Sequence, residues 1–473
     1  MLKQRYIDSN AAPFSKVVPT QVASPYWVAF NEALAEQINL PHRASPELLA
    51  VFSGQAIFKD THPIAQKYAG HQFGGWNPDL GDGRGLLLGE WQDNRQQLWE
   101  FHLKGAGKTP YSRFGDGRAV LRSSIREYLG SEALNAIGIP TTRALALIGS
   151  NEQVVRETTE PGATLLRVTQ SHVRFGHFEW LAYQRDEKAL KHLADFVIEH
   201  HYPEAALQEL PYASLFELIV KRTAKMMAYW MAYGFVHGVM NTDNMSILGE
   251  TFDYGPFAFL DTTKMNAVFN HTDQTGRYAF NQQPSIAMWN LQKLAQALSL
   301  IVPEEALKRA LALFAPRCDE QYYQLLNRRL GGNLQQPIPP ALCAQWIELL
   351  ANNHLDFHWY FRQLSKLELN QWETLVDEFT DRDAFLAWNK SVQPYLEQDS
   401  ANRLTQMQQS NPATVARTEL LQLVIDAAYQ GDFKPFESFY AALMSPFEER
   451  PQWSQWQQKP QNIDQHISLS CSS

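Results

Sequence analysis

Hydrophobic runs and alternations in the first half of the chain predict a group of β-strands. Residues 85–91 (GLLLGEW) and 97–105 (QLWEFHLKG) have the pattern of two paired strands, with the turn DNRQ between them. Residues 143–150 (RALALIGS) and 164–171 (TLLRVTQS) are predicted to form two further strands. We therefore expect a strand-rich region that starts with a Gly-rich loop after residue 70.

Apolar residues at a spacing of four predict a helix between these two pairs of strands. The stripe consists of Leu121, Ile125, Leu129 and Ala133. Gly138 follows the stripe, as glycines do at helix C-termini. Asp116 precedes it, and we expect its carboxylate to cap the free amides of the first helical turn.

The second half of the chain is predicted to be mainly helical. A long helix that ends near Gly234 is indicated by one apolar face, made of Leu215, Ile219, Met226 and Trp230. An irregular polar stretch follows Asp253, and helical patterns resume at about Ile286. The proline-containing first 58 residues are predicted to be an irregular extension with one helix near residues 28–37.

A small strand-rich region followed by a large helical region is the order found in protein kinases. The sequence therefore predicts an α+β, protein kinase-like two-lobed fold. We expect an N-terminal extension at residues 1–60, an N-lobe with the nucleotide-binding loop at 61–185, and a helical C-lobe with a C-terminal helical extension at 186–473.

Composition narrows the expected environment and partners. The 473 residues carry a formal net charge of -9, so the excess of Lys and Arg that broad nucleic-acid binding needs is missing. The N-terminus lacks the pattern of a secretory signal, and no apolar run approaches the roughly 20 residues that span a bilayer. The 3 cysteines have neither metal-ligand spacing nor the even count of a disulfide scaffold. We expect a cytoplasmic protein with no nucleic-acid or membrane partner.

The segment HGVMNTDN at residues 237–244 raises the question of which reaction, if any, this chain catalyses. It has the length and both ends of the kinase catalytic loop His-Arg-Asp-Leu-x-x-x-Asn, but Val239 replaces the catalytic aspartate. Three interpretations are open at this point: an inactive kinase, an unrelated loop, and a kinase-like site that carries out a different reaction.

Other kinase-like features occur in the expected order along the chain. Gly81 and Gly83 lie in the loop NPDLGDGRG, where glycines let the backbone approach a polyanion, and Arg84 adds a positive charge. Lys104 closes the next strand, as the phosphate-binding lysine does in kinases. Glu127, on the following helix, is spaced for the matching ion pair. Each feature alone also fits an ordinary turn or a solvated charge, but their order indicates a nucleotide site.

Further charged residues extend this candidate site. Arg167 and Arg174 have no counterpart in the kinase template and could neutralise a triphosphate that lies differently. Asn244 holds the metal-binding position of the loop, and Asp253 opens DYG, close to the kinase Asp-Phe-Gly, so this pair suits Mg²⁺. Asp243 is expected to be ionised at neutral pH and able to accept a proton.

Three long segments closely resemble the selenoprotein O family, known in bacteria as YdiU. They are 68–85 (YAGHQFGGWNPDLGDGRG), 102–129 (HLKGAGKTPYSRFGDGRAVLRSSIREYL) and 237–261 (HGVMNTDNMSILGETFDYGPFAFLD). The resemblance implies a pseudokinase-type fold that binds ATP in a flipped orientation. It also implies transfer of AMP, instead of the terminal phosphoryl group, to Ser, Thr or Tyr hydroxyls of proteins.

The same resemblance implies roles for individual residues. Nucleotide contacts are implied for Gly81, Gly83, Arg84, Lys104, Asp116, Gly117, Arg167, Arg174 and Asp253. Glu127 would hold Lys104, and Asp243 would be the catalytic proton acceptor. Asn244 and Asp253 would bind Mg²⁺, with Mn²⁺ as the alternative ion. ATP, or another nucleotide such as UTP, would be the co-substrate.

The family often ends with selenocysteine or cysteine shortly before the C-terminus, and this chain ends SCSS with Cys471. A redox role for Cys471 is therefore a hypothesis, and a tail thiol without a role is the alternative. Residues 254–284 contain no cysteine, so a disulfide from the tail to that loop cannot form. An atypical protein kinase and a non-catalytic nucleotide-binding scaffold are the alternatives to AMP transfer.

Overall fold

The computed structural model describes residues 2–41, 43–460 and 469 of the chain. Its strands are β1 (Phe14–Lys16), β2 (Tyr26–Phe30), β3 (Ile64–Gln72), β4 (Gly75–Gly81), β5 (Gly85–Gln92), β6 (Leu98–Lys104), β7 (Ala119–Val120), β8 (Arg143–Val155), β9 (Thr159–Thr169), β10 (Phe235–Val236) and β11 (Ala258–Phe259). Its α-helices are α1 (Arg5–Asp8), α2 (Glu32–Gln37), α3 (Pro46–Phe52), α4 (Leu121–Ile137), α5 (Phe175–Tyr183), α6 (Glu187–His201), α7 (Pro211–Ala232), α8 (Gln283–Leu298), α9 (Glu304–Leu311), α10 (Phe314–Arg329), α11 (Pro340–Asn352), α12 (Phe357–Leu364), α13 (Arg382–Val392), α14 (Ser400–Gln408), α15 (Thr418–Tyr429) and α16 (Lys434–Met444).

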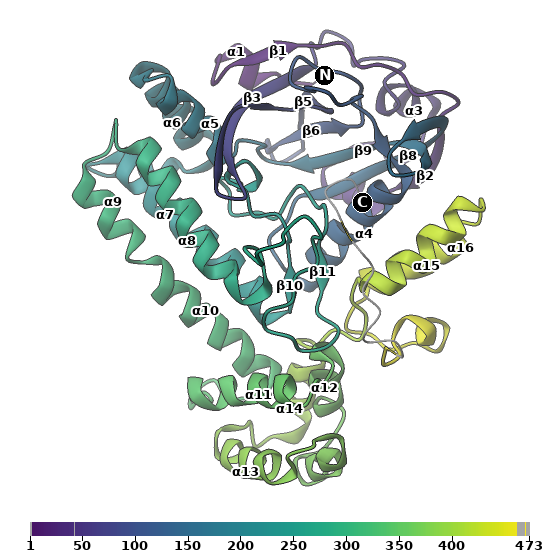
Figure 1. The fold of residues 1–473 in the computed structure, drawn as a ribbon, viewed down its shortest axis with the longest axis vertical. Helices are drawn as coiled ribbons and strands as arrows, with labels where there is room; N and C mark the ends of the chain where they lie inside the picture. The colour runs from purple at the N-terminus through teal and green to yellow at the C-terminus, as the bar shows by residue number, and fades with distance from the viewer. Residues whose placement is uncertain (1, 42, 461–468, 470–473) are drawn as a thin grey trace.

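An antiparallel sheet of nine strands forms the upper part of the molecule in Figure 1. Its strands follow the order β1-β3-β5-β6-β9-β8-β2, with β4 paired to β3 and β7 paired to β9. The four strands predicted from hydrophobic pattern are confirmed as β5, β6, β8 and β9. The protein is thus a mixed helix and strand structure with an antiparallel, strand-rich region, as expected.

Both faces of the sheet are buried, which explains the continuous apolar run of β5. Leu86 and Leu88 pack into a core that includes Leu34 of α2 and Phe52 of α3. Leu87, between them, points to the opposite face and packs into the core that α4 shares. Successive side chains of a strand face opposite sides, so a strand covered on both faces needs apolar residues throughout.

The first 58 residues differ from the prediction. Residues 26–30 (YWVAF) form β2, which pairs with β8, instead of starting a helix over residues 28–37. Helix α2 begins only at Glu32, because the side chain of Asn31 caps it by accepting a hydrogen bond from the backbone N of Leu34 (3.0 Å). This segment also supplies β1, so the expectation of an irregular extension with a single helix is wrong.

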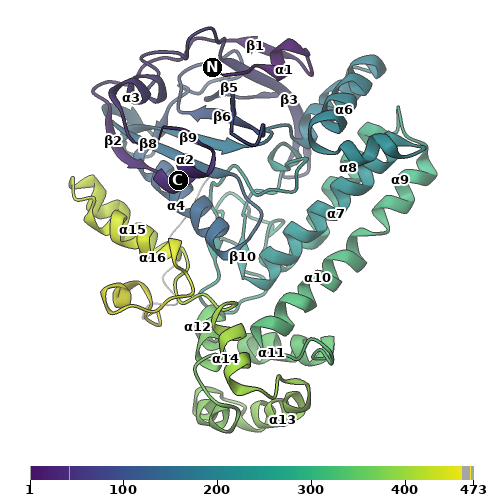
Figure 2. The same cartoon turned by 180° about the vertical axis from the view of Figure 1, so that it is seen from behind.

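Helix α4 lies against the sheet and buries its predicted stripe. Leu121, Ile125, Leu129 and Ala133 are all buried. Polar side chains such as Arg126 and Glu127 are buried too, because β8 and β9 cover one side of α4 while α15 and α16 cover another (Figure 2). Gly138 ends the helix with φ of 92°, the left-handed conformation that favours glycine.

Asp116 does not cap α4, which corrects the prediction. The helix begins at Leu121, and Val120 at its N-cap position makes no side-chain cap bond. Residues 119–120 form β7 and pair with β9, so the chain is extended where a helical turn was expected. The Asp116 carboxylate instead accepts a hydrogen bond from the backbone N of Arg118 (2.9 Å) and pairs with Arg156 Nη1 (2.7 Å).

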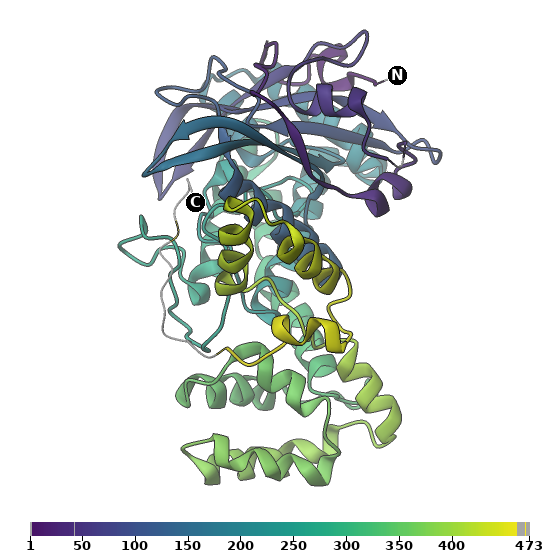
Figure 3. The same ribbon diagram turned by 90° about the vertical axis from the view of Figure 1, so that its right-hand side faces the viewer.

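The second half of the chain is mainly helical, as predicted. Helix α7 buries Leu215, Ile219, Met226 and Trp230. Helix α10 packs against α7, and α11 to α14 lie at the lower end of the molecule (Figure 1). Figure 3 shows the sheet lying across the top of this helical part. Within the described residues, we find no helix with the length and apolar character needed to cross a membrane.

Candidate active site

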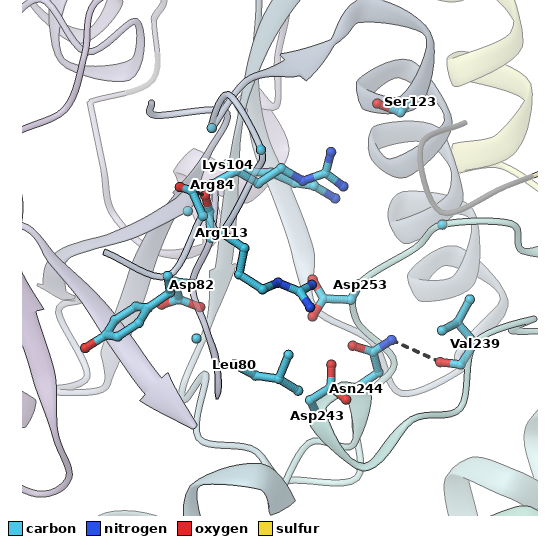
Figure 4. A pocket seen from close by; sticks show the side chains of 18 of the residues that line it. Leu80, Asp82, Arg84, Lys104, Arg113, Ser123, Val239, Asp243, Asn244 and Asp253 are labelled. Carbon is cyan, nitrogen blue, oxygen red and sulfur yellow. Dashed lines mark hydrogen bonds between the residues drawn. The ribbon is translucent and has the colours of Figure 1, made fainter. Parts of the chain in front are cut away.

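A cavity of about 820 Å³ opens between the sheet and the loops that follow α7. The predicted site residues that line it are Gly81, Gly83, Arg84, Lys104, Asp116, Gly117, Arg167, Arg174, Asp243, Asn244 and Asp253. Figure 4 shows Lys104, Arg84 and Arg113 on one side of the cavity and Asp253, Asn244 and Asp243 on the other. Glu127 is not part of the lining, but it forms an ion pair with Lys104.

The Gly-rich loop joins β4 to β5, and two of its glycines make room for side chains of the protein itself. A Cβ at Gly81 would lie 2.5 Å from the ring of Tyr111, and one at Gly85 would lie 2.3 Å from the ring of His102. Neither glycine has a φ in the left-handed region. Packing alone therefore requires glycine at these two positions. The expectation that the loop approaches a polyanion is a separate reason for glycine.

A buried ion pair connects β6 to α4. The Nζ of Lys104 contacts Oε2 of Glu127, and Oε1 of Glu127 lies 3.2 Å from Nε of Arg167. Burial lowers the pKa of Lys104 to about 8, against the charge of Glu127, which acts in the opposite direction. The carboxylate of Glu127 thus holds two buried cations, one from β6 and one from β9, at the cavity wall.

Asp253 is fixed by two arginines. Its Oδ1 accepts a hydrogen bond from Nη1 of Arg167 (2.7 Å), and its Oδ2 accepts one from Nη1 of Arg174 (2.6 Å). Burial alone would raise the pKa of Asp253, but the charges of Arg167, Arg174 and Lys104 outweigh it and hold the pKa well below its usual range. Asp253 is therefore an ionised carboxylate at the cavity wall.

Arg174 is held in place by aromatic rings as well as by acids. Its guanidinium carbon lies 4.6 Å from the ring centroid of Tyr68 and 4.6 Å from that of Phe252. Its Nη1 also donates a hydrogen bond to the backbone oxygen of Asp243 (2.8 Å). Arg174 thereby contacts both Asp243 and Asp253.

Asn244 is oriented by the residue that replaces the kinase aspartate. The Nδ2 of Asn244 donates a hydrogen bond to the backbone oxygen of Val239 (3.0 Å; Figure 4). This contact assigns the amide nitrogen and leaves Oδ1 of Asn244 as an acceptor. Over the described ranges, no group of three or more His, Cys, Asp or Glu side chains is placed to hold a metal ion.

Asp243 is a buried carboxylate, with 7% of the residue exposed. Burial raises its pKa to about 7, and the charge of Arg174 and a hydrogen bond from Gln72 offset this only in part. That hydrogen bond runs from Nε2 of Gln72 to Oδ2 (3.3 Å), whereas Oδ1 has no hydrogen-bond partner among the described residues. With a pKa of about 7, Asp243 is partly protonated at neutral pH, which differs from the fully ionised carboxylate expected from sequence, and its Oδ1 is buried against Gly70.

The end of β3 contacts the loop at residues 237–244, and this contact was not predicted from the sequence. A Cβ at Gly70 would lie 2.7 Å from Oδ1 and 3.1 Å from the backbone N of Asp243. The backbone N of His71 donates a hydrogen bond to Oγ1 of Thr242 (2.7 Å). A glycine inside a strand often marks such a close approach, which was the available signal.

We expect Gly70→Ala to lower the catalytic rate about 100-fold, because a displacement of a reacting group by about 1 Å has an effect of that size. The added methyl group has no space beside Asp243, whose backbone oxygen accepts a hydrogen bond from Arg174. Gly75→Ala is the matched control in the same hairpin, since its Cβ would come no nearer than 3.4 Å to the backbone oxygen of Gln72. Steady-state rates of both variants test this, and equal rates would contradict it.

The tail residue Cys471 lies outside the described residues, so its redox role stays a prediction. Cys318 and Cys343 are free, buried cysteines. Burial raises the pKa of each of these two thiols to about 12, which makes them poor nucleophiles at neutral pH.

Comparisons with known proteins find relatives over nearly the whole chain. The family model described as Protein adenylyltransferase SelO matches residues 2–444. A Vibrio parahaemolyticus protein named Protein nucleotidyltransferase YdiU is 48% identical over 478 residues, which cover 99% of this chain and 98% of that protein. Proteins of the same name from Vibrio cholerae and Pseudomonas aeruginosa are 46% and 45% identical, with 98% of each covered.

Proposed function

Because the chain belongs to the protein adenylyltransferase SelO family and is a protein nucleotidyltransferase, we propose that its cavity transfers AMP from ATP to Ser, Thr or Tyr hydroxyls of proteins. The observation that carries this proposal is the meeting of Lys104, Arg167 and Arg174 with Asp243 in one cavity. Three cations suit a triphosphate, and the carboxylate beside them suits removal of a proton from an acceptor.

The reaction is an attack of the acceptor hydroxyl oxygen on the α-phosphorus of ATP. A new P–O bond forms, the bond between the α-phosphorus and the bridging oxygen breaks, and pyrophosphate leaves. Asp243, which lines the cavity, accepts the hydroxyl proton on its carboxylate. Lys104 and Arg167 stabilise the charge that develops on the departing pyrophosphate.

We infer that ATP binds in a flipped orientation in a kinase-like two-lobed fold. The positions of Arg167 and Arg174 support this inference. Arg167 and Arg174 lie against Asp253, where the outer phosphates of a flipped triphosphate would need extra positive charge. Asp116 and Gly117 line the same cavity and would contact the nucleotide there, together with Gly81, Gly83 and Arg84. We infer that residues 61–185 and 186–473 are the two lobes that enclose the nucleotide.

The oxygen donors at the cavity wall fit Mg²⁺ or Mn²⁺. The Oδ1 of Asn244 is left as an acceptor by the contact of Nδ2 with Val239. The carboxylate of Asp253, with roughly four lone-pair sites, retains capacity beyond its two arginine contacts. A divalent ion bound by few protein oxygens plus phosphate oxygens would neutralise phosphate charge and polarise the reacting phosphate.

We expect removal of divalent cations with EDTA to abolish AMP transfer without unfolding the protein. Without a cation, the phosphates would meet the negative charges of Asp253 and Asp243 at the same wall. Excess Mg²⁺ or Mn²⁺ should restore activity, and circular dichroism should be unchanged throughout. Full activity of the protein in EDTA would contradict the metal assignment.

Intact-mass spectrometry of the protein incubated with ATP and Mg²⁺ tests the proposed function. We expect self-modification that adds the mass of one AMP per site, and a parallel sample with UTP shows whether UMP is also transferred. Addition of a phosphoryl group alone would overturn the proposal in favour of a kinase. An unchanged mass, with no AMP or pyrophosphate formed, would favour a nucleotide-binding scaffold.

A further inference from the structure

An exposed aromatic surface lies beside the catalytic loop, outside the nucleotide cavity. Phe73, in the turn between β3 and β4, and Trp76, near the start of β4, are 38% and 37% exposed, and Tyr183 at the end of α5 is 56% exposed. We call this surface the aromatic rim, and it consists of Phe73, Trp76, Tyr183, Arg277, Trp289 and Lys293. Helix α5 packs against both β3 and α8, which brings these elements together (Figure 1).

The rings of the aromatic rim form one continuous surface. The ring centroids of Trp76 and Tyr183 are 5.5 Å apart. The ring of His71 bridges Trp76 (4.9 Å) to Trp289 on α8 (5.2 Å). Phe73 contacts the buried ring of Tyr278 (5.2 Å), and the guanidinium carbon of Arg277 lies 5.8 Å from the centroid of Tyr278 and 4.6 Å from that of Trp289, which connects Phe73 to the other rings. Large aromatic side chains that stay this exposed are the usual centre of a protein interaction surface.

Two cations belong to the same surface, and the acid beside them, Asp273, is buried and accepts hydrogen bonds from the backbone N of Arg277 (3.0 Å) and of Tyr278 (2.7 Å). The guanidinium carbon of Arg277 lies 4.6 Å from the ring centroid of Trp289, and Nζ of Lys293 lies 4.9 Å from the same centroid. Neither cation is within ion-pair distance of an Asp or Glu in the described part of the chain. The nearby acids Glu179 and Asp79 are paired elsewhere, with His71 and Lys67 respectively.

The aromatic rim is continuous with the place where the acceptor hydroxyl must bind. Gln72 lines the cavity and donates a hydrogen bond to Oδ2 of Asp243, and the next residue, Phe73, belongs to the rim. The backbone N of Phe73 donates a hydrogen bond to Oδ1 of Asn241 in the catalytic loop (3.1 Å). A polypeptide that presents a hydroxyl to Asp243 would therefore pass over this rim.

We propose that the aromatic rim docks the acceptor segment of the protein substrate, and that this segment carries acidic and apolar side chains next to the hydroxyl that receives AMP. The charge of the rim is the reason: the chain as a whole has a formal net charge of -9, yet this surface presents two cations that form no ion pair with any described residue. Acidic side chains would pair with Arg277 and Lys293, while apolar side chains would cover Phe73 and Trp76. This inference rests on the proposed AMP transfer and adds its substrate class.

Two synthetic peptides with the same central Ser test the docking. One carries Glu and Phe around the Ser, and the other carries Lys in place of each Glu. We expect a higher kcat/KM for AMP transfer to the acidic peptide. Reversing both charges (Arg277→Glu with Lys293→Glu) should lower that value about tenfold or more, chiefly by raising KM, since about 1.4 kcal/mol of lost attraction gives a factor of ten. Lys293→Glu alone, on the surface of α8, is a second variant that still tests the docking if the double variant fails to fold.

The matched control is Lys390→Glu, the same charge reversal on an exposed lysine of α13, at the far end of the molecule (Figure 1). Release of AMP from ATP with water as the acceptor should be the same in all variants. Equal kcat/KM for both peptides, or modification of neither while the water reaction proceeds, would overturn the docking proposal alone. If the unchanged protein neither modified itself with AMP nor released AMP or pyrophosphate from ATP, the proposed function itself would fail.

Discussion

Asp243→Asn should lower AMP transfer about 10²–10⁴-fold while ATP binds with unchanged affinity, because removal of a general base costs this much and the phosphates contact other groups. The amide keeps the shape of the carboxylate but cannot take the hydroxyl proton. Rates with α-phosphate-labelled ATP and binding constants from calorimetry measure the two quantities separately.

The melting temperature distinguishes lost chemistry from lost structure in this variant. Asp243 is a buried carboxylate, and an uncharged amide avoids the cost of burying a charge, so Asp243→Asn should melt at the same temperature or higher. Asp79→Asn is the control, because the Asp79 side chain is 86% exposed on β4 and far less constrained. Retained activity in Asp243→Asn would show that another group accepts the proton.

Glu127→Gln should destabilise the protein by about 3–5 kcal/mol, the usual cost of removing one partner from a buried ion pair. The Glu127 side chain is 1% exposed and serves both Lys104 and Arg167, so the change leaves two buried cations with less negative charge around them. Urea titration measures this loss of unfolding free energy. ATP with Mg²⁺ should restore part of the stability, because phosphates would replace the missing charge.

The matched control is Glu152→Gln, in the ion pair of Glu152 with Arg118 (2.8 Å), where the Glu152 side chain is 28% exposed. Pairs this accessible contribute only about 0–1 kcal/mol, so we expect a small effect. Combining Lys104→Met with Glu127→Gln should recover stability but not activity. Equal losses of unfolding free energy for Glu127→Gln and Glu152→Gln would show that the buried ion pair contributes no more to stability than the exposed one.

The parts of the fold that could be predicted from sequence are those with a local periodic signal. Strands β5 and β6 have long apolar runs, and helices α4 and α7 have apolar residues every three or four positions, so each was found. Strand β2 was missed because its conformation depends on pairing with β8, more than a hundred residues away in the chain. Asp116 was misassigned as a cap because pairing of Ala119 with Ala163 keeps the chain extended there.

The same distinction applies to the candidate site. Lys104 and Glu127 were predicted as an ion pair from their order and spacing, and the structure places them in contact. The contact of Gly70 with Asp243 joins residues far apart in sequence, and a glycine inside a strand indicates a close approach without indicating which residue approaches. The aromatic rim likewise joins distant segments, since its members come from the β3–β4 turn, β4, α5, the loop before α8 and α8.

Parallel reactions with ATP labelled on the α-phosphate or on the γ-phosphate test the central claim, AMP transfer, most directly. Label from the α-phosphate should appear on protein together with an equal amount of free pyrophosphate, and label from the γ-phosphate should appear only in that pyrophosphate. Transfer of the γ-label to protein, with ADP as the product, would contradict AMP transfer.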